Sequence, residues 1–135
     1  MVTATSVVTG FLDDVWCESR FDRTEAYIDP RYELGDLGRG PDASATNART
    51  FREAFPDLRV RVVDVIEQGS RVAVWMRLSG TQRGEFRGHP ASNRHATWDE
   101  IGFFTVDDGK IVARRYLADA FGLRKALGII PAATR

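Results

Sequence analysis

Two periodicities divide the chain into a helical N-terminal part and a C-terminal part made of strands. Up to Phe55, apolar residues recur at intervals of three and four, as on one face of an amphipathic helix. From Leu58 onward, apolar and polar residues alternate, which is typical of strands with one covered face. Helices followed by antiparallel strands predict an α+β fold, with the helices on one face of the sheet.

Three helices are predicted before the sheet. The apolar stripe of the first consists of Val7, Val8, Phe11, Leu12, Val15 and Trp16, with Thr3 or Ser6 as its N-cap. A short second helix over 23–29 follows Asp22 and Glu25, which are spaced as in a capping box, and it ends before Pro30. The third begins at Pro41, ends before Pro56, and has the inner stripe Ala45, Ala48, Phe51 and Phe55.

Alternation predicts strands over 58–66 and 71–79, a short strand over 84–87, and a long hairpin over 94–119. Asp108-Gly109 is the expected hairpin turn, because glycine adopts a positive φ without steric cost. Asp64 shares parity with apolar neighbours, so it is either an inward structural carboxylate or is turned outward by a bulge. Asp119 is expected to cap a last helix that ends at Gly128.

Composition and charge narrow the classes of function. The 135 residues, with 19 basic and 19 acidic side chains, are expected to form one domain over 1–135 without the basic footprint of a nucleic-acid-binding protein. The chain contains no apolar run long enough to cross a membrane and no recognisable signal peptide, so a cytoplasmic protein is expected. Its single cysteine, Cys17, excludes an internal disulfide and is interpreted as a half-buried structural thiol.

The hairpin carries the candidate chemistry. Side chains two residues apart share a face, so Trp98, Glu100 and Phe104 lie together on the first arm, and Arg114 and Tyr116 lie together on the second. Apolar groups mixed with a few polar ones are typical of a pocket wall. Burial raises the pKa of a carboxyl such as Glu100, whereas Arg114 acts in the opposite direction. Glu100 either transfers a proton or forms a cross-strand ion pair with Arg114 that only sets the register.

Three stretches of the sequence resemble the SnoaL-like polyketide cyclases of the nuclear transport factor 2-like superfamily. They read FPDLRVRVVDVIEQGSRVAVWMRLSGTQRGEFRG, RHATWDEIGFFTVDDGKIV and LADAFGLRKALG. The resemblance extends roughly from Val7 to Gly128. It implies a cone-shaped, strongly bent, mixed or antiparallel sheet, with three N-terminal helices on its concave face and a short C-terminal helix.

The same resemblance implies an aspartate base after the Lys-Ile-Val stretch and a polar partner on the neighbouring arm. This chain has Tyr116 and Gly102 at the corresponding positions. A phenol is a poor base at neutral pH, so an aldol closure does not carry over. Ring formation by attack of a hydroxyl on an epoxide or enone, or by pericyclic closure, is favoured instead. Such reactions depend more on positioning than on a strong base.

The expected function is that of a cofactor-independent cyclase or isomerase acting on a polyketide-like natural-product intermediate. The predicted catalytic residues are Glu100, Tyr116 and Arg114; the predicted substrate-binding residues are Trp98, Phe104, Met76, Trp16 and, near the pocket mouth, Tyr32. Two alternatives stay open: a hydrolase or dehydratase of a small apolar substrate, and a binding module without chemistry.

No metal site and no cofactor are expected. His95 and Asp99 have no third ligand at metal spacing, and His89 and His95 are assigned to the rim or to solvent. Trp75 and Arg77 fall on the sheet face opposite the pocket. An exposed tryptophan there, together with the family resemblance, predicts a homodimer through the outer sheet face. Neither a nucleic acid nor a membrane is an expected partner.

Overall fold

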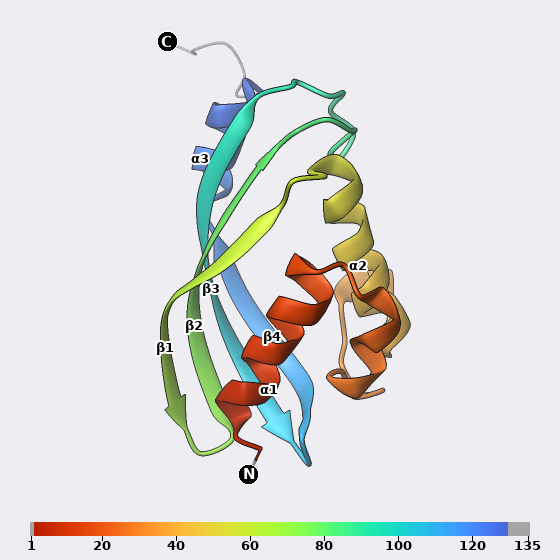
Figure 1. Ribbon diagram of the computed structural model, residues 1–135, viewed down its shortest axis with the longest axis vertical. Coiled ribbons are helices and arrows are strands. Elements are labelled where there is room, and N and C mark those ends of the chain that lie inside the picture. The colour runs from red at the N-terminus through yellow and green to blue at the C-terminus, as the bar shows by residue number, and fades with distance from the viewer. Residues whose placement is uncertain (1, 130–135) are drawn as a thin grey trace.

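The computed structural model describes residues 2–129. Its sheet has four antiparallel strands in the order β1 (Arg59–Gln68), β2 (Arg71–Thr81), β3 (His95–Asp107) and β4 (Lys110–Ala118). The sheet is strongly bent, and α1 (Ala4–Phe11) and α2 (Gly40–Ala54) lie against its concave side (Figure 1). The predicted α+β fold is therefore confirmed.

The β3–β4 hairpin turns where the sequence predicts. Asp108 and Gly109 have φ values of 50° and 77°, and Asp107 pairs with Lys110 on either side of them. Positive φ at both central residues is typical of a type I′ turn, whose twist matches that of the two strands. Beyond the turn, the register shifts by one residue between Thr105 and Val106, so this bulge as well as the turn decides which side chains of the two arms share a face.

A bulge in β1 settles the position of Asp64. The register with β2 shifts between Val62 and Asp64, so that Val62 opposes the buried Met76 and Asp64 opposes the exposed Trp75. One extra residue in a strand reverses the facing of every residue beyond it. Asp64 is consequently exposed on the outer face, and an inward structural carboxylate at this position is wrong.

The first helical segment changes its winding before it ends. Thr3 caps α1 by accepting from the Ser6 N–H, and the chain continues as a π-helical turn, η1 (Leu12–Cys17). In that turn the Glu18 N–H donates to the Asp13 carbonyl, five residues back, at 2.9 Å. Single π turns are rare and are frequent at functional sites. Cys17, at its end, donates its thiol to the Val60 carbonyl at 3.3 Å, in keeping with a structural role.

Two local predictions are wrong. The second helix is a 3-10 helix, η2 (Phe21–Ala26), preceded by Arg20 with no side-chain cap, so the spacing of Asp22 and Glu25 does not produce a capping box. The segment 84–87 is a tight turn and not a strand: the Phe86 N–H donates to the His89 carbonyl and the His89 N–H returns the bond, both at 2.9 Å. A glycine on each side of 85–87 favours this turn over a ladder.

Two further helical elements complete the fold. A further 3-10 turn, η3 (Gly35–Leu37), precedes α2, and α3 (Ala120–Leu127) begins where Asp119 accepts from the Gly122 N–H at 2.9 Å. That cap is as predicted. The core between helices and sheet includes Phe11, Phe55, Val74, Phe104 and Ile111. Among the described helices, none combines the length and the apolarity that a membrane span requires.

Candidate active site

Cross-strand register brings the candidate residues onto one wall. Glu100 opposes Met76 on β2 and Ala118 on β4, while Gly102 opposes Tyr116. Directly opposed residues of antiparallel strands point to the same side of the sheet. Here that side is the concave one, which the helices cover only in part.

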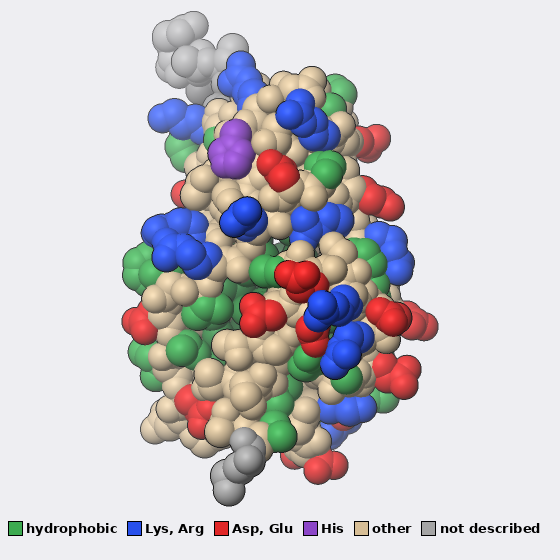
Figure 2. All heavy atoms as spheres, viewed as in Figure 1, with side chains coloured by type: hydrophobic (Ala, Val, Ile, Leu, Met, Phe, Trp, Pro, Cys, Tyr) green, Lys and Arg blue, Asp and Glu red, His purple; other side chains and the backbone are tan. Residues whose placement is uncertain are grey.

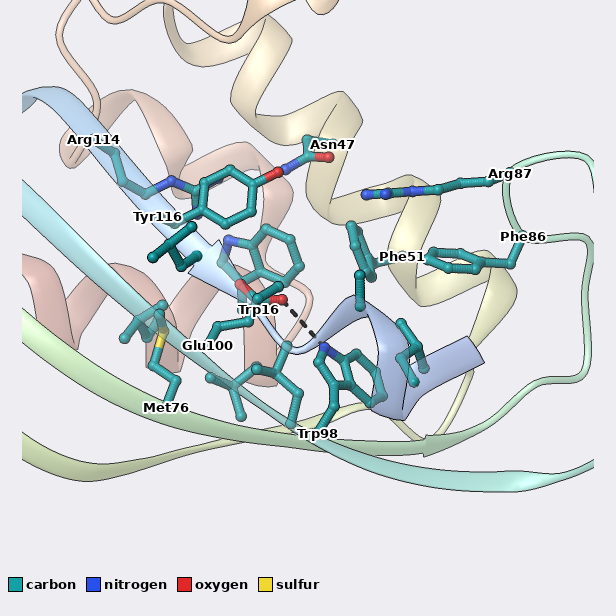
Figure 3. A pocket seen from close by; sticks show the side chains of 17 residues that line it. Trp16, Asn47, Phe51, Met76, Phe86, Arg87, Trp98, Glu100, Arg114 and Tyr116 are labelled. Atoms are coloured by element: carbon teal, nitrogen blue, oxygen red, sulfur yellow. Dashed lines mark hydrogen bonds between the residues drawn. The ribbon is translucent and has the colours of Figure 1, made fainter. Parts of the chain in front are cut away.

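A cavity of about 430 Å³ lies between this wall and the helices (Figure 3). Its volume is in the range of small-molecule sites. Its lining is mostly apolar, and the polar or charged members are Trp16, Asn47, Arg87, Trp98, Glu100, Arg114 and Tyr116. Figure 2, in which the sheet lies on the left and the helices on the right, shows a hollow with hydrophobic side chains, basic groups above it and acidic groups beside it.

Glu100 is the one carboxylate among the described residues that line this cavity. Its Oε2 accepts a hydrogen bond from the indole Nε1–H of Trp98 at 3.2 Å. Burial raises the pKa of the Glu100 carboxyl above its ordinary value, while the Trp98 N–H, Arg114 and Arg87 lower it to a smaller extent. Within residues 2–129, Glu100 and Arg114 do not form an ion pair, so a cross-strand pair does not account for Glu100.

Arg114 and Tyr116 form a stacked pair at the edge of the cavity. The Arg114 guanidinium lies 4.5 Å from the centroid of the Tyr116 ring, which is 47% exposed. Figure 3 shows both side chains over the same space as Glu100. Their N–H and O–H groups are donors, as required of groups that stabilise negative charge developing on a substrate oxygen.

Trp16 brings a donor without an acceptor to the cavity wall. Its side chain is 7% exposed, and within the described chain its Nε1–H has no hydrogen-bond partner. The other two indoles both donate to carboxylates: Trp98 to Glu100, and Trp75 to Asp99 at 3.0 Å on the outer face. An unpaired buried donor is costly, so the cavity wall is short of acceptors.

Two polar lining residues were not predicted from the sequence, Asn47 and Arg87. Asn47 projects from the middle of α2, and Arg87 from the turn after β2. Arg87 stacks on Phe86, with 5.0 Å from guanidinium to ring centroid. The sequence does mark 84–88 as rich in glycine, but it contains no signal that this turn reaches the hairpin wall.

Two predicted residues do not line the cavity. Tyr32 is 2% exposed and lies in the core, so it is not at a pocket mouth. Phe104 is fully buried and covers Gly102: a Cβ on that glycine would lie 2.8 Å from Cε1 of Phe104. A larger polar residue at Gly102 therefore requires Phe104 to move.

Both histidines lie outside the cavity. The ring of His95 is in contact with the Thr81 hydroxyl at 3.2 Å at the far end of β3, and His89 belongs to the turn after β2. The predicted residues that do line the cavity are Trp16, Met76, Trp98, Glu100, Arg114 and Tyr116.

Comparison with known proteins agrees with this architecture. Residues 6–127 match the family described as SnoaL-like polyketide cyclase, and the chain belongs to this family. A curated relative, nogalonic acid methyl ester cyclase of Streptomyces nogalater, is 29% identical over 116 residues, covering 81% of this chain and 86% of the relative.

Solved structures show the same nuclear transport factor 2-like fold. TsrD from Streptomyces laurentii superposes with a TM-score of 0.86 at 23% identity, covering 93% of this chain and 95% of that one. A SnoaL-like polyketide cyclase from Agrobacterium tumefaciens strain C58 superposes with a TM-score of 0.82 at 20% identity, covering 95% and 100%. Identities this low establish the fold and leave the reaction to be argued from the site.

Proposed function

We propose that this protein is a cofactor-independent cyclase or isomerase of a polyketide-like natural-product intermediate, with Glu100 as the group that transfers the proton. One observation carries the proposal: a carboxyl held by the Trp98 indole lies inside a mostly apolar cavity of small-molecule size. Its raised pKa makes its carboxylate a stronger base than an exposed glutamate.

The geometry supports ring closure by addition of a hydroxyl to an enone. Glu100 removes the hydroxyl proton as the new C–O bond forms, and the π electrons of the enone move onto its oxygen. Tyr116 donates to that oxygen while it is an enolate, and the positive charge of Arg114 stabilises it. The proton held by Glu100 then passes to the α-carbon, so no oxidant, reductant or further reactant is consumed.

The apolar walls make a second contribution to the rate enhancement. Met76, Leu78 and Phe51 line the cavity and exclude water from a folded substrate. Holding the hydroxyl against the enone carbon of the same substrate removes conformational freedom before the transition state, which lowers the barrier by several kcal/mol. The same positioning serves a pericyclic closure, for which Glu100 only fixes the substrate.

A comparison of two substrates tests the reaction class. A hydroxy-enone polyketide is expected to cyclise with multiple turnovers. Nogalonic acid methyl ester, after which the Streptomyces nogalater relative is named, is expected to remain unchanged, because Tyr116 replaces the aspartate base expected from the family. Aldol closure of the ester without closure of the hydroxy-enone contradicts the proposal.

We also propose that two copies associate through the outer sheet face. Its exposed apolar members include Ile66, Trp75, Ile101 and Phe103. Beside them, Arg77 binds Asp99 through Nε at 2.8 Å, and Asp99 also accepts from Trp75. An apolar centre flanked by charges of both signs is self-complementary about a two-fold axis, the commonest symmetry of dimers.

A further inference from the structure

The cavity carries more positive than negative charge. Its ionisable lining residues include two guanidiniums, Arg87 and Arg114, against the single carboxyl of Glu100. In the described part of the chain neither arginine forms an ion pair, although elsewhere arginines such as Arg31 and Arg77 pair with aspartates. Because the whole chain is neutral, this excess of positive charge is a local property of the cavity.

Aromatic rings hold both guanidiniums in place. Arg114 lies over the Tyr116 ring at 4.5 Å, and Arg87 lies over Phe86 at 5.0 Å and over Phe51 at 5.8 Å. Stacking uses the flat face of a guanidinium and leaves the N–H groups at its edge free to donate. The N–H groups of both arginines are therefore held in position, and in the described part of the chain most of them have no protein acceptor.

The backbone at Arg87 is an independent sign of function. Arg87 and Gly88 have φ values of 50° and 84°, within the turn closed by Phe86 and His89. Asparagine or glycine adopts such a conformation at lower energy than arginine does. Strained positions of this kind cluster at binding and catalytic sites, and this one brings the guanidinium to the cavity.

We propose that the substrate carries a carboxylate, which Arg87 and Arg114 bind together at the edge of the cavity. Figure 3 shows the two side chains extending from opposite sides, with the Asn47 amide between them and with Glu100 and Trp98 on the opposite wall. A planar carboxylate matches the donor geometry of a guanidinium. Binding at this edge keeps the anion away from Glu100 and places the apolar part of the substrate on the Met76 side.

This inference deepens the proposed function and rests on it for the location of the substrate. It states a specificity that the family name does not contain: a free acid is preferred over its ester. The methyl ester in the name of the Streptomyces nogalater relative is neutral at that position.

Calorimetric titration of two matched probes tests the proposal. Naphthalene-2-carboxylate and its methyl ester share the ring system and differ in charge. The wild type is expected to bind the acid about tenfold more tightly than the ester, and added salt should reduce this preference. Arg87→Met and Arg114→Met are each expected to lower affinity for the acid by about tenfold and to change affinity for the ester little.

Arg71→Met is the matched control, because Arg71 is an exposed arginine that does not line the cavity. It should leave both affinities unchanged, while Arg87→Lys should retain part of the preference for the acid. Equal binding of acid and ester by the wild type, or equal loss of both in the Arg→Met variants, overturns the proposal. The readout is binding, so this result leaves the role of Glu100 in turnover to its own test.

Discussion

The indole N–H of Trp98 is bound to Oε2 of Glu100, two residues further along β3, at 3.2 Å. Both side chains point to the concave side because alternate residues of a strand share a face. This bond stabilises the ionised carboxylate, whereas burial of the same group favours the neutral acid. Trp98 therefore positions Glu100 and adjusts its basicity.

Replacing this indole should shift the pH dependence of the reaction. In Trp98→Phe the ionised Glu100 loses a donor, so its pKa should rise further. If Glu100 acts as a base, the rising limb of log(kcat/KM) against pH should move to higher pH, because kcat/KM reports the free enzyme. A profile that only falls in height, with no displacement of the limb, would assign Trp98 a purely structural role.

The stability of the protein should also depend on the charge of Glu100. Its pKa is raised in the folded state above the ordinary value of 4.5, so folding favours the neutral form. The contribution of Glu100 to stability is then complete below pH 4.5 and is lost as the pH rises through the folded pKa.

Glu100→Gln should accordingly be more stable than the wild type at neutral pH, with a higher Tm. The gain should shrink as the pH falls toward 4.5, where the wild-type carboxyl is also neutral. Thermal unfolding of the wild type and of Glu100→Gln between pH 4.5 and neutral pH tests this prediction. A lower Tm for Glu100→Gln at neutral pH means that the carboxylate is structural.

Tyr116→Phe tests the role of the hydroxyl at the cavity edge. The ring and its stacking on Arg114 are retained, and the side chain is half exposed, so Tm should not change. If the hydroxyl donates to developing charge, kcat should fall by about 10- to 100-fold, equivalent to about 1–3 kcal/mol. An unchanged kcat at saturating substrate places the hydroxyl outside the reaction.

Association through the outer face is tested with a charged substitution. Phe103→Asp buries a carboxylate in the proposed contact and should yield monomers at tens of micromolar by light scattering, whereas the wild type is expected to be a dimer. Leu37→Asp is the control, because Leu37 is similarly exposed but lies in η3 and away from the sheet. A wild type that is monomeric at this concentration contradicts the proposed dimer.

Much of this site is predictable because strand geometry is local. Alternation along β4 places Arg114 and Tyr116 on one face, and a bulge after the Asp108-Gly109 turn brings that face to the side of Glu100. The pattern within each arm is predictable from the sequence, whereas the bulge that aligns the two arms is not; the fold class follows from the change of hydrophobic period at Leu58.

Residues outside the regular strands were harder to place. Arg87 reaches the cavity through a tight turn, and Asn47 through the docking of α2 on the sheet, both of which depend on tertiary packing. Tyr32 lies in an irregular segment without periodicity, so its burial gave no signal in the sequence. In β1, an inserted residue at the bulge reversed the facing expected for Asp64 by simple alternation.

The most direct test of the central claim is the turnover of Glu100→Gln on a hydroxy-enone substrate, with the folded fraction measured on the same samples. We expect kcat/KM to fall by about 10²- to 10⁴-fold, the range for loss of a general acid–base group, with the fold intact. Glu25→Gln, an exposed glutamate outside the cavity, should retain wild-type activity. Wild-type turnover by a folded Glu100→Gln protein would contradict the assignment of proton transfer to Glu100.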